Sequence, residues 1–363
     1  MLNSRSSLLA IAGIGDTFGE KYANPAVLPV GTGLGVAFSP AGNAVVVTHS
    51  TTPFISAYQW SSSGFGARYT NPAVLPNGMP GSSGGGVQFT PNGSHVITVE
   101  TDGLNPNRLV AYQWSPTTGL GAKQTLALTD LNVRSLDVSP SGSYIAVAGI
   151  SAAALKPLVV VPWTGTAFGS PGITSSQTVS SGDALSVKFI PDGSQIAIGT
   201  ASNGNFIYPF SGGLLGSPST LPGAINTARC ITFDSAGNTI YLGQFFSGGT
   251  ANTRIAGWKR SASGQFNIPI ETGTSLLIAS TAQSLSMSPL NNLLVAGMTS
   301  SVSPLNTYRL SGGSILYRYA DPLTIPTNGI TTRQAIAFSP SGDAVAICHQ
   351  TSPFVTAYKI TTN

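Results

Sequence analysis

Three arginines stand near the start of strand-like segments and could together hold an anion. Arg134 and Arg229 each lie six residues before a Pro- or Ser-anchored turn, and Arg333 lies seven residues before another. Gln283 occupies the equivalent place in a further segment. Guanidinium groups bind carboxylates and phosphates through paired hydrogen bonds, so arginines brought together would form an anion-binding funnel. Alternatively, each arginine pairs with backbone carbonyl groups of nearby loops, and the sequence leaves both alternatives open.

A carboxylate and an ammonium recur at a second equivalent place. Asp137 and Lys188 each lie three residues before the turns of successive segments. Charged groups at a packed interface are tolerated when they are paired. We therefore expect Asp137 and Lys188 to form a structural ion pair between neighbouring units of the fold.

The remaining residues of chemical interest favour structural roles. His49 and His349 are equivalent, in THSTTPF and CHQTSPF, but a zinc site needs three or four ligands, so hydrogen-bonded histidines are favoured. Glu100 and Asp102 are a close acidic pair, but calcium usually needs more oxygen ligands. The four tryptophans end equivalent segments, which favours packing between units over sugar stacking; they are Trp60, Trp114, Trp163 and Trp258. No metal and no cofactor is expected.

Sequence signatures of common enzymes are missing. The chain contains no G-x-S-x-G elbow, no H-E-x-x-H motif and no sialidase-type Asp-box. Its 12 acidic residues mostly stand singly. We predict no catalytic residue and expect that the protein is not an enzyme.

The composition narrows the classes of protein and partner. Of 363 residues, 43 are Gly and 25 are Pro, and 8% are charged, against about 25% in an average domain. With 41% hydrophobic residues, the chain is neither a coiled coil nor a charged disordered polymer. The net charge is +4, but the basic residues are scattered, whereas nucleic-acid binding needs a basic stripe. No apolar run approaches the roughly 18 residues of a membrane-spanning helix. We predict a β-rich protein that does not bind nucleic acid and has no membrane-spanning helix.

An internal repeat supplies the elements that position the polar residues. Seven turns recur at spacings of 51, 49, 51, 44, 54 and 51 residues, anchored at Pro40, Pro91, Pro140, Pro191, Ser235, Pro289 and Pro340. Apolar residues alternate on both sides of each turn, as in VAFSPAGNAVVV from Val36, and alternation with period two predicts strands. Pro presets φ, and the Gly two residues later, replaced once by Asn291, accepts a left-handed conformation. Each segment therefore predicts a tight, bulged hairpin.

Two further strands follow each hairpin. The third is clear in every copy, as in FISAYQW from Phe54, and the fourth is weak in the middle copies. The last copy lacks a fourth strand, and FGEKYANPAVLP from Phe18 matches the fourth strand of the first copy, FGARYTNPAVLP from Phe65. We predict an all-β, seven-bladed β-propeller with four-stranded antiparallel blades, in which the N-terminal strand Phe18–Tyr22 closes the last blade.

The repeats resemble those of WD-repeat-like and surface-layer-type seven-bladed propellers, in which an S-P-x-G or P-D-G hairpin recurs in each blade. FSPSGDAVAICHQTSPFVTAY (Phe338 to Tyr358) and GFGARYTNPAVLP (Gly64 to Pro76) further resemble a repeat type associated with bacteriophage and environmental sequences. The resemblance covers residues 16 to 363. The Trp-Asp dipeptide of true WD repeats is absent, so adaptor roles in histone-tail or ubiquitin-ligase recognition are not implied.

We divide the chain into an N-terminal arm, residues 1–15, and a propeller domain, residues 16–363. The arm, MLNSRSSLLAIAGIG, could be an extra strand of the last blade or a docking arm that buries Leu8, Leu9 and Ile11 against a partner. Arg5 followed by the apolar run Leu8–Ala12 could also be a signal peptide, although such peptides usually have 15–30 residues.

Our main hypothesis is a non-enzymatic structural or binding protein of a bacteriophage virion: a fibre, a decoration protein or a tail-associated propeller. Its partners would be other virion structural proteins or a host-surface receptor or glycan, and its location the virion. One alternative is a propeller lactonase-type hydrolase that holds an anionic substrate at Arg134, Arg229 and Arg333. Another is a soluble peptide-binding adaptor, cytoplasmic or secreted. The sequence specifies neither the oligomeric state nor the face that binds.

Overall fold

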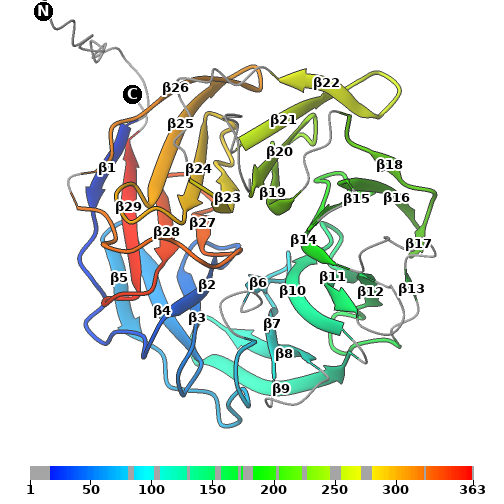
Figure 1. Ribbon diagram of the computed structural model, residues 1–363. Coiled ribbons are helices and arrows are strands. Elements are labelled where there is room, and N and C mark those ends of the chain that lie inside the picture. Colours follow the sequence, from blue (N-terminus) through cyan, green and yellow to red (C-terminus); the bar gives the residue numbers. More distant parts are fainter. Residues whose placement is uncertain are drawn as a thin grey trace, which may run out of the picture.

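The chain folds into seven antiparallel sheets that are arranged as blades around a central axis (Figure 1). The computed structural model describes residues 17–80, 86–101, 107–128, 131–151, 157–170, 173–174, 183–201, 204–222, 227–245, 255–270, 280–322 and 324–361. All regular elements in these ranges are strands. Within the same ranges, no helix could cross a membrane. The predicted all-β, seven-bladed propeller is confirmed.

The strands of each blade run outward from the channel in chain order, except that the outermost strand of blade 7 is β1. Blades 1 to 3 consist of β2 (Gly33–Phe38), β3 (Ala44–His49), β4 (Ile55–Ser61) and β5 (Gly64–Arg68); β6 (Val87–Phe89), β7 (His95–Glu100), β8 (Arg108–Ser115) and β9 (Gly119–Ala127); β10 (Leu131–Val138), β11 (Tyr144–Ser151), β12 (Leu158–Pro162) and β13 (Ile173–Thr174). Blades 4 and 5 consist of β14 (Ala184–Phe189), β15 (Gln195–Thr200), β16 (Phe206–Ser211), β17 (Leu214–Leu215) and β18 (Ser219–Thr220); β19 (Ala228–Phe233), β20 (Thr239–Gln244), β21 (Ile255–Arg260) and β22 (Phe266–Ile270). Blades 6 and 7 consist of β23 (Ala282–Met287), β24 (Leu293–Met298), β25 (Leu305–Ser311) and β26 (Ser314–Arg318); β27 (Ile336–Phe338), β28 (Ala344–Cys348), β29 (Val355–Thr361) and β1 (Thr17–Lys21).

The outer strands are weakest where the sequence signal is weakest. In blade 3 the outer strand β13 has only two residues, and in blade 4 it is split into β17 and β18, which both pair with β16. The inner hairpin forms in every blade because its turn residues accept the backbone conformation that the turn needs. Gly42 adopts φ 67°, and Asn291, the one non-Gly residue at this turn position, adopts φ 58°.

The predicted closure of the ring is confirmed. Strand β1 pairs antiparallel with β29, with Thr17 opposite Thr361 and Phe18 opposite Ile360. The two strands, blue and red in Figure 1, lie side by side although they come from opposite ends of the chain. Blades 7 and 1 are also joined beside the channel, where Val36 N donates to the carbonyl oxygen of Gln334 at 3.2 Å.

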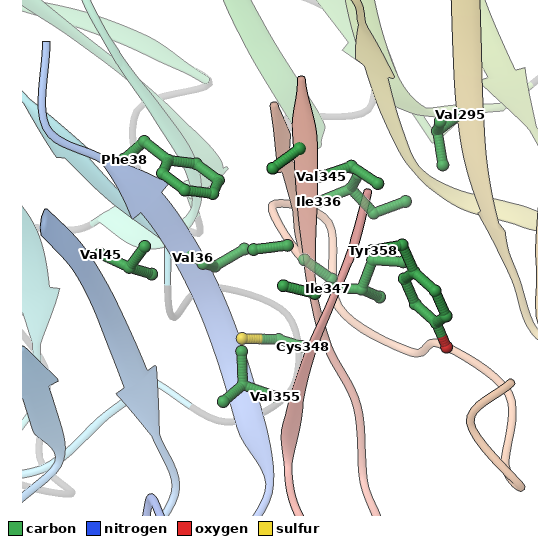
Figure 2. Close-up of a cluster of buried hydrophobic side chains, with 14 of the residues drawn as sticks. Val36, Phe38, Val45, Val295, Ile336, Val345, Ile347, Cys348, Val355 and Tyr358 are labelled. Carbon is green, nitrogen blue, oxygen red and sulfur yellow. The ribbon is translucent and has the colours of Figure 1, made fainter. Parts of the chain in front are cut away.

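The hydrophobic core is a series of layers between blades. The cluster at the closing seam joins blade 1, through Val36 and Phe38, to blade 7, through Ile336, Ile347 and neighbouring side chains (Figure 2). Comparable layers lie between the other neighbouring blades. Because both faces of each blade are packed, few positions can carry charge, which accounts for the low charged content.

Candidate functional site

A ring of β-bulges lies at one end of the central channel. In five inner strands the register skips one residue, always six positions before the turn anchor: Leu34, Arg134, Leu185, Arg229 and Gln283. We call these five residues the bulge collar. A bulged residue leaves the hydrogen-bond ladder and its side chain is re-aimed. Because Arg134 and Arg229 are bulged, their side chains do not follow the alternation by which neighbouring side chains pack between blades.

The structure brings the three predicted arginines together at the collar. Burial, followed by the positive charges of Arg134 and Arg229, lowers the pKa of Arg333 to about 10. Coulomb interactions between partly solvated groups fall steeply with distance and screening. The guanidinium groups of Arg134, Arg229 and Arg333, from blades 3, 5 and 7, are therefore near enough for the charges of the first two to act on the third.

Arg134 and Arg229 keep unused hydrogen-bonding capacity at this site. Their Nε atoms are buried and have no hydrogen-bond partner among the described residues. Arg229 Nη1 donates to Gln283 Oε1 at 3.4 Å, and Arg229 Cζ lies 4.7 Å from the centre of the Phe245 ring. Burial lowers the pKa of Arg134 and the charge of Asp183 opposes that shift. Among the described residues neither Arg134 nor Arg229 donates to a backbone carbonyl; the loops at residues 129–130, 175–182, 223–226 and 246–250 lie outside the described ranges, so the alternative of loop-carbonyl pairing stays open.

The channel continues from the collar to the ring of hairpin turns. It has a volume of about 520 Å³, and Arg333, Gln334 and Cys230 lie among its lining residues. Gln334 belongs to blade 7, yet its Nε2 donates to the carbonyl oxygen of Leu136 in blade 3 at 2.7 Å. Gly86 provides the room, because a Cβ atom there would overlap the Gln334 amide. The Gln334 side chain therefore crosses the channel beside the arginines.

A hydrogen-bonded polar wall lines one side of the channel. Lys188 Nζ lies 2.7 Å from Asp137 Oδ1, so the two residues expected to pair across blades 3 and 4 are in contact. Gln88 Nε2 donates to the same oxygen at 2.7 Å, and Phe189 N donates to Asp137 Oδ2 at 2.7 Å. Val138 N donates to Gln88 Oε1 at 3.0 Å. Asp137, only 3% exposed, thus joins three successive blades.

The histidines are buried structural groups in the described structure. His49 ends β3 and its Nε2 lies 2.9 Å from Ser56 Oγ. His95 Nδ1 lies 2.9 Å from Ser94 Oγ, and its ring packs edge-on against Trp163. Burial lowers the pKa of His49 and of His349 to about 4. Both are therefore neutral at pH 7.

The tryptophans and Glu100 also have packing partners. Trp60 contacts Tyr22, Phe38 and Phe65 edge-on. Equivalent aromatic or hydrogen-bonded contacts hold Trp114, Trp163 and Trp258. Glu100 is 1% exposed and lies 2.6 Å from Lys123 Nζ.

Several predicted residues lie outside the described residues. They are Asp102 and the candidate docking residues Leu8, Leu9 and Ile11. Among the described residues, no group of three or more His, Cys, Asp or Glu side chains is placed to hold a metal ion.

Sequence reasoning missed two glutamines of the channel. Gln88 lies three residues before its turn anchor, the position of Asp137 and Lys188, and comparing that position in all seven copies would have found it. Gln334 lies six residues before Pro340, the position of Arg134 and Arg229, so the same comparison would have included it. That its side chain crosses to blade 3 has no sequence signal.

The fold is that of a seven-bladed β-propeller whose channel has one hydrogen-bonded polar wall. No protein-family model matches the chain, and no curated protein matches it. Among solved structures it is similar to Kuenenia stuttgartiensis hydrazine synthase, with a TM-score of 0.66 and 12% identity over 93% of this chain and 98% of that one. It is also similar to the Cps50 (Swd1) β-propeller domain of Myceliophteria thermophila, with a TM-score of 0.64 and 10% identity over 95% of this chain and 100% of that one. Likeness at this identity shows the fold alone, which is compatible with a binding or structural role.

Proposed function

We propose that this protein is a non-enzymatic binding protein that holds an anionic group of its partner at the bulge collar. The convergence of Arg134, Arg229 and Arg333 carries the proposal. Like charges gathered in a partly buried site repel one another, and a bound anion relieves that repulsion. Carboxylate and phosphate oxygens also suit guanidinium donors such as the Nε atoms of Arg134 and Arg229, which have no partner in the described part of the chain.

We further propose that the protein acts as a structural component of a bacteriophage virion. The similarity of its end repeats to a repeat type associated with bacteriophage supports this setting. The partner is another virion structural protein or a host-surface receptor or glycan, and the anionic group belongs to that partner. The propeller then acts as a rigid platform that presents the collar.

Thermal unfolding with citrate as a probe tests the collar. Citrate at about one hundred times its dissociation constant stabilises the folded protein by about 2.7 kcal/mol. The double variant R134Q/R229Q is expected to lose this increment. K359Q is the control, because Lys359 is an exposed lysine on β29 with its Nζ 3.8 Å from Glu20. General salting effects of citrate act on all three proteins alike, so the difference between variants is the readout.

An equal rise in Tm for the wild type and R134Q/R229Q would overturn the collar site. The virion assignment has a separate test, mass spectrometry of purified particles together with the genes on either side. Absence from particles would overturn the virion assignment and leave the collar site standing. Lactone hydrolysis that disappears in R229A would overturn the non-enzymatic assignment in favour of the hydrolase.

A further inference from the structure

The channel below the collar has the size and lining of a separate small-molecule pocket. Its volume of about 520 Å³ falls within the range of about 300–1,000 Å³ of ligand sites. Prolines of the hairpin turns rim its mouth, on the opposite face from the collar: Pro40, Pro140, Pro191, Pro289 and Pro340. Gln334, bonded to the Leu136 carbonyl, crosses its inner end. A small molecule would therefore enter from the hairpin face.

The charged residues that line the channel favour an anion. They are Asp137, Lys188 and Arg333, which together carry a net charge of +1. Both Asp137 oxygens already accept hydrogen bonds, from Gln88, Lys188 and Phe189. An ammonium group has three donors, and Lys188, whose side chain is 37% exposed, donates to Asp137. The polar wall thus offers a ligand donors rather than free acceptors.

The opposite side of the channel is apolar. Ala37 and Ala337 lie at the repeat position that Asp137 and Lys188 occupy in blades 3 and 4. Phe338 and Met287 line the same space, and both are only partly buried. Small alanine side chains leave room beside these larger ones. The hydroxyl-bearing residues Thr232 and Ser286 of blades 5 and 6 separate the two sides. The pocket is therefore amphipathic.

We propose that this pocket binds a small amphipathic organic anion at Lys188, away from Arg134 and Arg229 of the collar, with Arg333 bordering both sites. Its anionic head binds the Lys188 ammonium, and its apolar or aromatic body packs against Ala37, Ala337 and Phe338. The hydrogen-bonded Asp137 holds Lys188 in place across the blade interface. Arg333, at the inner end, adds a positive potential that favours an anion over a neutral molecule of the same shape.

Fluorescence titration with 8-anilinonaphthalene-1-sulfonate tests the pocket, because this probe is an aromatic organic anion. The wild type is expected to bind one equivalent that octanoate displaces. K188Q removes a charge-assisted hydrogen bond and should weaken binding about ten- to hundredfold. A337M fills the apolar side without touching the polar wall and should weaken binding as strongly. The K359Q control should bind as the wild type does.

Circular dichroism and thermal unfolding establish that each variant is folded. Failure of the folded wild type to bind the probe, or wild-type affinity in both K188Q and A337M, would overturn the proposal. R134Q/R229Q separates the two sites, because it should lose the citrate response and keep the probe. Loss of both responses in that variant would overturn the independence of the pocket.

Discussion

Replacing Asp137 by Asn should destabilise the propeller at the interface of blades 2, 3 and 4. The substitution preserves shape but removes the charge and turns one acceptor into a donor. If the amide oxygen stays toward Phe189 N, the NH2 group faces the Gln88 amide and the Lys188 ammonium, both donors. If the amide flips, its NH2 group faces the buried backbone N–H of Phe189. Neither orientation satisfies all three partners.

The expected loss is about 3 kcal/mol. A buried donor left without its acceptor costs about 1–3 kcal/mol, and a hydrogen bond to a charged group contributes about 1.5–3 kcal/mol. The Lys188 contact is discounted to about 1 kcal/mol or less, because that side chain is 37% exposed. Scaling an unfolding entropy of about 2.1 cal/mol/K per residue to 363 residues converts this loss to a fall in Tm of about 4 °C. Differential scanning calorimetry and urea unfolding at pH 7 measure it.

Asp343→Asn is the matched control. Asp343 is exposed at a hairpin turn, where its Oδ1 accepts hydrogen bonds of 2.6 Å from the hydroxyl groups of Ser339 and Ser341. Its replacement should change stability by about 0.5 kcal/mol or less. A D137N variant as stable as D343N would refute the reasoning that Asp137 joins three blades.

Three further outcomes follow from buried or strained groups. Burial lowers the pKa of His49 and His349 to about 4, so below pH 6.5 the unfolded chain binds more protons than the folded protein does. The free energy of unfolding should therefore fall between pH 6.5 and about pH 4, by up to about 1.4 kcal/mol per pH unit for each histidine. Urea titrations should show a smaller pH dependence in H49Q/H349Q. Both thiols are buried, and burial raises the pKa of Cys230 to about 12 and also raises that of Cys348, so Ellman's reagent at pH 8 should react only after denaturation. Asn291 adopts φ 58°, so N291A should cost about 1 kcal/mol more than N291G in chemical denaturation, and equal losses would contradict the backbone argument.

The collar shows which part of the site the sequence could predict. Arg134 and Arg229 each lie six residues before their turns, and this spacing was sufficient to align them. The repeat assigns equivalent positions to equivalent depths in the channel. Their shared bulge was not predicted as such, since the register shift after Val133 and after Ala228 depends on pairing with β11 and β20. A bulge is a property of two strands together, so one strand's residues do not encode it alone.

The contacts of the polar wall were likewise predictable from the sequence only in part. Alignment of the copies was enough to expect Asp137 beside Lys188, because neighbouring blades bring equal repeat positions together. It did not indicate that the Gln88 amide and the Phe189 N–H would occupy the remaining sites on the Asp137 carboxylate. Those contacts depend on side-chain direction at the channel edge, which the repeat pattern does not specify.

The sequence by itself determined the number of blades, the hairpin at each turn and the closure by a strand predicted at Phe18–Tyr22, which the structure places at Thr17–Lys21. These features depend on local φ preferences, on alternation with period two and on repeat matching, and all three are written along the chain. Only the tertiary structure decided that the charges of Arg134 and Arg229 act on Arg333 and that Gln334 reaches Leu136, 198 residues away in the chain. The physical reason is that ring closure sets the distance across the channel, and charges from separate blades meet only once that distance is fixed.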